Sequence, residues 1–124
     1  MKIKTSDLIG AQLDWAVAVA VAAYCQETGS NDLHSGKHWV IHGFKPMRWD
    51  DWTPSTDWSQ GGPLIERFGL EITRYNENFW AAIKKWEYDF NDYYPVGETI
   101  LIAAMRAIVA AKIGEEIEVP EGLV

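Results

Sequence analysis

The chain has 124 residues, of which 48% are hydrophobic and 23% charged, and its formal net charge is −7. This length suits one domain with a core of its own, and the composition is that of a globular protein. The eleven Lys and Arg residues are scattered along the chain, which argues against binding of long nucleic acid through its phosphates. We therefore expect a single domain spanning residues 1–124.

Cysteine content and hydropathy predict a cytoplasmic protein. Cys25 is the only cysteine, so no disulfide can form within the chain, and we expect it to be a small buried hydrophobic residue. No targeting segment opens the sequence. The longest apolar run, Trp15–Cys25, is well short of the roughly 20 residues that a membrane-spanning helix needs. We expect no contact with a membrane.

The first elements expected are a short edge strand over Met1–Thr5, a helical turn that Ser6 caps and Gly10 ends, and a helix over Ala11–Tyr24. Two apolar stripes run along this helix, one through Leu13, Val17, Ala20, Val21 and Tyr24, the other through Trp15, Val19 and Ala22. The helix is therefore expected to be buried on two sides, or to join two copies of the chain as a homodimer.

The middle of the chain alternates turn formers with short elements. We expect a strand over Lys37–Phe44, a long loop over Trp49–Pro63, and one helical turn over Leu64–Phe68, with Pro63 in its first position. His34, His38 and His42 have the spacing of metal ligands on a helix, but Gly36 and the Val40–Ile41 pair argue against a helix there. We expect no metal and no cofactor.

The last part of the chain predicts a hairpin followed by a helix. The expected strands are Leu70–Tyr75 and Phe79–Tyr88, joined by a turn at Asn76–Asn78, although the second also tolerates a helical period. Thr99 is expected to cap a helix that runs to Ile113 and stops at Gly114, and Glu115–Val124 to add an edge strand. The expected fold is α+β: an N-terminal helix, a central antiparallel hairpin or sheet, and a C-terminal helix packed on the sheet.

The most distinctive segment is the loop itself, which reads WDDWTPSTDWSQGGP. Trp faces suit a flat base, and two glycines ahead of a helix can offer free main-chain N–H groups to an anion. Arg67 follows closely, and Arg106 lies within the apolar last helix, where it could pair with Asp57 or with a ligand anion. The residues predicted to bind a ligand are Trp52, Thr56, Asp57, Trp58, Gln60, Gly61, Gly62, Arg67 and Arg106.

A structural role for the same residues is the alternative. Long loops need aromatic anchors, the glycines can serve a backbone conformation, and Thr56 or Asp57 can cap a turn. Arg106 can equally lie at a helix edge with its guanidinium in water. No Ser/His/Asp arrangement and no P-loop occurs, so we predict no catalytic residue.

Three blocks of the sequence resemble the NinX-like proteins of lambdoid and related phages, a family of unknown function. These are Met1–Ala18, Ile100–Glu121 and the more specific PSTDWSQGGPLIER at Pro54–Arg67. The stretch Gln26–Arg48 matches little of the family pattern. The resemblance implies a phage-encoded accessory protein acting in the cytoplasm of the infected bacterium, and it implies no activity.

Three functions compete at this point. The first is binding of a small nucleotide-like or other planar anionic host molecule, with sequestration of a bacterial defence signal as its purpose. The second is docking on a host or phage protein through exposed Trp side chains on an acidic surface. The third is hydrolysis of a nucleotide, with Asp57 and Arg67 as acid and anion clamp.

Overall fold

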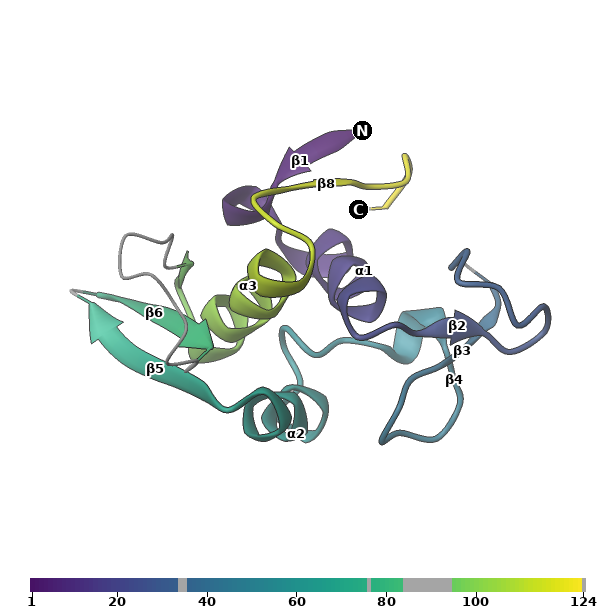
Figure 1. The fold of residues 1–124 in the computed structure, drawn as a ribbon, viewed down its shortest axis with the longest axis horizontal. Helices are drawn as coiled ribbons and strands as arrows, with labels where there is room; N and C mark the ends of the chain where they lie inside the picture. Colours follow the sequence, from purple (N-terminus) through teal and green to yellow (C-terminus); the bar gives the residue numbers. More distant parts are fainter. Residues whose placement is uncertain (34–35, 76, 84–94, 124) are drawn as a thin grey trace.

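The computed structural model describes residues 1–33, 36–75, 77–83 and 95–123. Within these ranges the chain forms three α-helices and three small antiparallel sheets (Figure 1). The expected α+β class is confirmed, as are an N-terminal helix, an antiparallel hairpin and a C-terminal helix packed on that hairpin. None of the helices in the described ranges is long and apolar enough to span a bilayer.

Helix α3 (Ile100–Lys112) occupies the centre of the fold (Figure 1). It contacts α1 (Gly10–Ala20), α2 (Trp58–Phe68) and the hairpin of β5 (Leu70–Tyr75) and β6 (Asn78–Ile83). Its small side chains allow this close approach: Ala103 and Ala107 pack against Leu70, Ile72 and Phe79 of the hairpin. As predicted, Thr99 caps the helix, because its Oγ1 accepts a hydrogen bond from the Ile102 N–H at 3.1 Å.

The two ends of the described chain form one small sheet. Strand β1 (Lys2–Lys4) pairs antiparallel with β8 (Glu116–Glu118), which confirms the expected edge strands. The turn that follows β1 is the 3-10 helix η1 (Thr5–Asp7), and Ser6 does not cap it. Instead, the Thr5 hydroxyl donates to the Gly114 carbonyl oxygen at 2.6 Å. This long-range bond could not be anticipated from the local sequence.

Helix α1 ends four residues earlier than expected. Ala22 adopts a left-handed conformation with φ of 59°, the Ala22 N–H bonds to the Val19 carbonyl, and the Ala23 N–H bonds to the Ala18 carbonyl. This is the Schellman arrangement, in which glycine is the usual left-handed residue. Because Ala stands there, nothing in the sequence marked the end of the helix.

The early end of α1 frees β2 (Tyr24–Cys25) to join a three-stranded sheet with β3 (His38–Val40) and β4 (Met47–Arg48). Of the strand expected over Lys37–Phe44, only the β3 residues are in a strand. The sheet is small because each pairing joins only two residue pairs. It holds the segment before the loop on the far side of α1 from the hairpin (Figure 1).

The hairpin forms as predicted in its first strand and in the first part of its second. Tyr75 pairs with Asn78, and the described part of β6 ends at Ile83, so the rest of the expected strand, residues 84–88, lies outside the described residues. Strand β7 (Val96–Gly97), which the sequence did not indicate, pairs with β6. A Cβ on Gly97 would lie 2.5 Å from the Ala103 nitrogen, so glycine is needed for this strand to lie against α3.

Candidate functional site

Helix α2 begins inside the predicted loop. Asp57 caps it: its Oδ1 accepts hydrogen bonds from the N–H and the hydroxyl of Ser59, at 2.9 Å and 2.7 Å. Pro63, expected in the first turn, is therefore an interior residue of the helix. The Gly61 N–H donates to the Asp57 carbonyl at 2.8 Å, and Gly62 lies in the same helix. The expectation that the two glycines offer free N–H groups to an anion is wrong.

Gly61 and Gln60 make contacts that hold the loop in its conformation. A Cβ on Gly61 would lie 2.5 Å from Leu101 Cδ2 and 2.6 Å from the Pro54 carbonyl oxygen, so glycine is needed where α2 crosses α3. Gln60 Oε1 accepts from the Thr53 N–H at 2.6 Å, and its Nε2 donates to the Asp51 carbonyl oxygen at 2.7 Å. Both polar ends of Gln60 are thus engaged by the loop.

Trp52 and Trp58, both predicted to bind a ligand, differ in solvent exposure. Trp52 is 2% exposed; its Nε1 donates to the Asp14 carbonyl oxygen at 2.9 Å, and its ring meets Phe44 edge to face. Trp58, at the start of α2, is 56% exposed. Trp52 therefore anchors the loop in the core, whereas Trp58 is presented at the surface.

The two predicted arginines lie apart from the loop's other groups. Arg67 is exposed, donates to the His42 carbonyl oxygen at 3.3 Å and lies over the Phe68 ring. Arg106 donates to the carbonyl oxygens of Leu8, at 2.9 Å, and Val96, at 2.7 Å. The pairing of Arg106 with Asp57 that the sequence allowed is not found among the described residues: Arg106 donates to main-chain oxygens, and Asp57 Oδ1 accepts from Ser59.

A cavity of about 340 Å³ opens between the start of α1 and the loop. We call it the Trp pocket, because it is lined by Trp15, Trp39, Trp49 and Trp52, together with Asp14 and Asp50, and is completed by Gly10, Ala11, Thr53, Thr56 and Leu123. Of the residues predicted from the sequence, only Trp52 and Thr56 belong to this lining. Its acidic and aromatic groups come from segments that the sequence analysis did not connect.

Asp14 is the buried carboxyl of the Trp pocket, and the sequence analysis did not single it out. It is 6% exposed, and its Oδ1 accepts a hydrogen bond of 2.8 Å from the Ser55 N–H. Burial raises the pKa of Asp14 to about 6, and contacts with Ser55 lower it less. The Ser55 Oγ lies buried nearby without a hydrogen bond of good geometry to any described residue. An aspartate within the apolar α1 sequence was the available signal.

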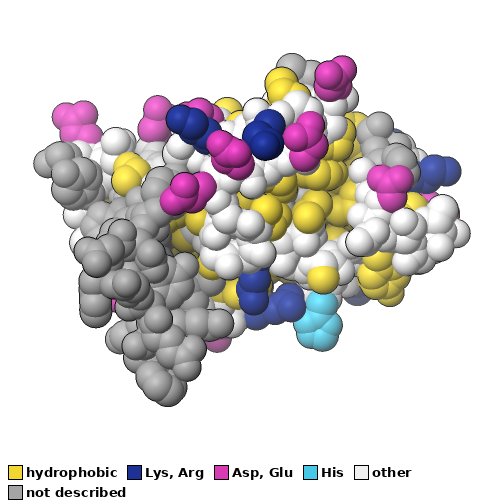
Figure 2. Space-filling model, turned by 45° about the horizontal axis from the view of Figure 1, so that its top comes forward, with side chains coloured by type: hydrophobic (Ala, Val, Ile, Leu, Met, Phe, Trp, Pro, Cys, Tyr) yellow, Lys and Arg dark blue, Asp and Glu magenta, His cyan; other side chains and the backbone are white. Residues whose placement is uncertain are grey.

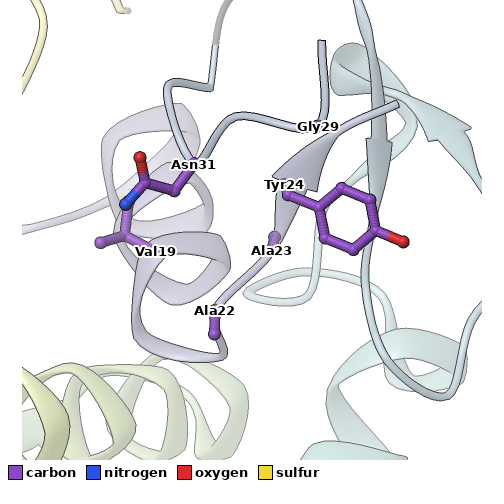
Figure 3. A pocket seen from close by; sticks show the side chains of 6 residues that line it. All are labelled: Val19, Ala22, Ala23, Tyr24, Gly29 and Asn31. Atoms are coloured by element: carbon purple, nitrogen blue, oxygen red, sulfur yellow. The ribbon is translucent and has the colours of Figure 1, made fainter. Parts of the chain in front are cut away.

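Two further pockets lie at the surface. One, of about 420 Å³, includes Thr56, Trp58, Phe79 and Glu98 in its lining. The other, of about 360 Å³, lies at the end of α1, where Figure 3 shows Asn31 beside Val19 and the Tyr24 ring turned away from both. Val19, Ala22 and Ala23 make up half of the described lining of this second pocket, in which no carboxyl group and no Trp ring is found among the described residues.

His38 and Cys25 share a local partner, Glu27. His38 is exposed, with its Nδ1 3.1 Å from Glu27 Oε1, and the fully buried Cys25 donates through Sγ to Glu27 Oε2 at 3.3 Å. No three potential metal ligands gather in the parts of the chain that are described, and His34 lies outside them. Figure 2 shows hydrophobic side chains gathered on one face, with acidic and basic residues along its upper edge.

Comparison with families of known sequences matches residues 4–112 to the family described as Bacteriophage P22, NinX. A search of curated proteins finds no match. The matched region includes the whole of the central block Pro54–Arg67, all of α1 and all of α3. It covers most of the 124 residues, and the chain therefore belongs to the Bacteriophage P22 NinX family.

Proposed function

We propose that this phage protein binds a small, planar, nucleotide-like molecule in the Trp pocket. The observation that carries the proposal is the convergence of four Trp residues and the Asp14 carboxyl on one cavity of about 340 Å³. Pockets of this size hold small ligands, and aromatic rings stack favourably on flat heterocycles. The carboxyl would give such a ring a hydrogen-bond acceptor, and with it an orientation.

The lining of the Trp pocket also indicates which end of a nucleotide-like ligand enters it. Among the described residues that line the pocket, Asp14 and Asp50 are charged and none is a Lys or Arg. The ring would therefore occupy the pocket, and any phosphate would remain outside, away from the two carboxyls. Binding of this kind needs no catalytic group, and sequestration of a host signal in the infected cell is the role we propose for it.

Isothermal titration calorimetry against nucleosides, nucleotides, cyclic nucleotides and NAD derivatives tests this proposal. We expect saturable one-to-one binding of at least one planar compound, weakened at least about tenfold by Trp49→Ala. Trp58→Ala is the matched control, because Trp58 does not line the Trp pocket, and it should leave the affinity unchanged. Absence of binding across the whole panel would refute the proposal.

Docking on another protein is the second candidate, and the exposure of Trp58 favours it. Trp is enriched at the energetic centres of protein interfaces, and 56% exposure is large for this residue type. Pull-down from infected-cell lysate should then recover a partner with the wild type and not with Trp58→Ala. The same partners with both proteins would exclude this surface. Hydrolysis gains no support from Asp57 and Arg67, which cap a helix and contact His42 respectively.

A further inference from the structure

The Trp pocket carries the chemistry of a cation site. We infer that the group it accepts is a planar organic cation, such as an N-alkylated heteroaromatic ring or an amidinium, rather than a neutral or anionic ring. The inference rests on the proposed function and names the class of ligand for the same pocket. Its basis is the combination of a buried carboxyl and aromatic rings in a lining whose described residues include no basic side chain.

Among the described residues, the Asp14 carboxyl has no positively charged partner. Its partner there is Ser55, whose N–H donates to Oδ1 at 2.8 Å and whose hydroxyl lies nearby, and neither group carries a charge. A carboxylate that is 6% exposed loses most of its hydration, and a cation in the pocket would offset that loss. The second lining carboxyl, Asp50, lies 3.6 Å from the Arg48 Nε at the surface. Among the described residues, Asp14 is therefore the lining carboxyl that has no positively charged partner.

The Trp residues favour the same class of ligand. Cations bind to the face of an indole ring, and Trp is the strongest of the aromatic residues in this interaction. Two of the indoles are held by their N–H groups: Trp15 Nε1 donates to the Leu33 carbonyl oxygen at 3.4 Å, and Trp52 Nε1 donates to that of Asp14 at 2.9 Å. Rings fixed in this way need little reorganisation when a ligand enters.

The charge of the protein points in the same direction. Two carboxyls in the lining repel an anionic ring, and the net charge of −7 attracts cations to the surface at low ionic strength. A neutral ring would gain stacking but would leave the Asp14 carboxylate without a charged partner. The cationic member of an otherwise matched pair of ligands should therefore bind more tightly.

Binding of the cation should depend on pH. Asp14 and Asp50 are the titratable side chains among the described lining residues, and the pKa of Asp14 is raised to about 6 by burial. The cation binds the ionised carboxylate, so its affinity should fall about tenfold between pH 7.5 and pH 5, as Asp14 takes up its proton. A neutral ring should show a much smaller change.

The test compares matched ligand pairs by calorimetry at pH 7.5 and pH 5: 1-methylnicotinamide with nicotinamide, and 1-methyladenosine with adenosine. At pH 7.5 we expect the cationic member of at least one pair to bind at least about tenfold more tightly. Asp14→Asn is the matched variant, because its amide oxygen can still accept the Ser55 N–H while the charge is lost. It should abolish both the preference for the cation and its pH dependence.

Each other outcome has a definite meaning. Equal or tighter binding of the neutral members overturns the cation inference and leaves the proposed function intact. A cation preference that persists in a folded Asp14→Asn protein also overturns it, since Asp14 would not be the source. If neither pair binds while another compound of the nucleotide panel does, the inference fails alone, and if nothing binds at all, both proposals fail.

Discussion

The main-chain N–H of Ser55 donates a hydrogen bond of 2.8 Å to the carboxylate of Asp14, which precedes it by 41 residues. This contact joins the loop to α1 at the Trp pocket. It also partly satisfies a buried acidic group that would otherwise be strongly destabilising when ionised. The stability of the fold and the chemistry of the pocket therefore depend on the same side chain.

We expect the stability of the protein to depend on pH through Asp14. The pKa of Asp14 rises from 3.8 to about 6 on folding, so the folded protein binds more protons than the unfolded chain between these values. Stability from this group is therefore present at low pH and falls by about 3 kcal/mol as the pH rises from about 4 to about 6. Urea denaturation of the wild type and Asp14→Asn at pH 4 to 7.5 measures it as the difference between the two curves.

The comparison with Asp14→Asn is needed because Glu27 titrates in the opposite sense. Hydrogen bonds from His38 and Cys25 hold the pKa of the exposed Glu27 carboxyl at about 2, so its contribution is lost as the pH falls. That contribution is common to both proteins and cancels in the difference. Parallel curves for the wild type and the variant would show that Asp14 titrates normally in the fold.

The two adjacent glycines of α2 should respond oppositely to the same change. Gly61→Ala would place a methyl group against Leu101 and the Pro54 carbonyl, and we expect it to lower the free energy of unfolding by about 1–3 kcal/mol. Gly62→Ala meets only Trp58, at 3.9 Å, and should raise stability by about 0.5–1 kcal/mol through helix propensity. Denaturant unfolding of both variants checks this, and similar effects would mean that α2 and α3 do not approach closely at Gly61.

Replacement of Trp52 and of Trp58, two of the three Trp residues of the loop, should affect stability very differently. Trp52→Ala removes a buried ring and its hydrogen bond to Asp14, and should cost about 3–5 kcal/mol. Trp58→Ala should change stability by less than about 0.5 kcal/mol. Thermal unfolding followed by near-ultraviolet circular dichroism distinguishes them. A large loss of stability in Trp58→Ala would mean that its ring is packed rather than exposed.

The left-handed residue at the end of α1 offers a stabilising substitution. Ala22 has φ of 59°, a conformation that costs a residue with a side chain about 1 kcal/mol relative to glycine. We expect Ala22→Gly to raise the unfolding free energy by about that amount. Ala23→Gly is the control: Ala23 is buried with ordinary φ, and its replacement should destabilise the protein. Stabilisation by both changes would contradict this account of the helix end.

The parts of the fold that could be predicted from the sequence are those marked by local chemistry. Thr99 caps α3 through its own hydroxyl, and Leu70–Tyr75 alternates polar and apolar residues as a half-buried strand does. The start of α2 was misplaced because Pro63 commonly stands in a first helical turn. Here Asp57 caps the helix, so the helix starts earlier. In a helix the residue at position 63 would donate its N–H to the Ser59 carbonyl, which Pro63 cannot do, and Ser59 is an exposed residue.

The site was harder to predict because its groups meet only in the folded chain. Asp14 and Trp39 lie far from the loop in sequence, yet both line the cavity that Trp52 and Thr56 reach. The loop's composition correctly drew attention to that region, but it could not show that Gln60 is occupied by main-chain groups of the loop. These hydrogen bonds form only when the folded loop brings Asp51 and Thr53 to the Gln60 side chain, and the composition of the loop does not specify that conformation.

The position of α3 along the chain has a consequence for synthesis. The helix against which α1, α2 and the hairpin all pack is formed by residues 100–112 of the chain, so those earlier elements have no common partner until it has left the ribosome. Until then, apolar faces of the nascent chain remain uncovered. We expect the core to be completed only after α3 has been translated. Until then, the apolar faces of α1, α2 and the hairpin are exposed and can aggregate.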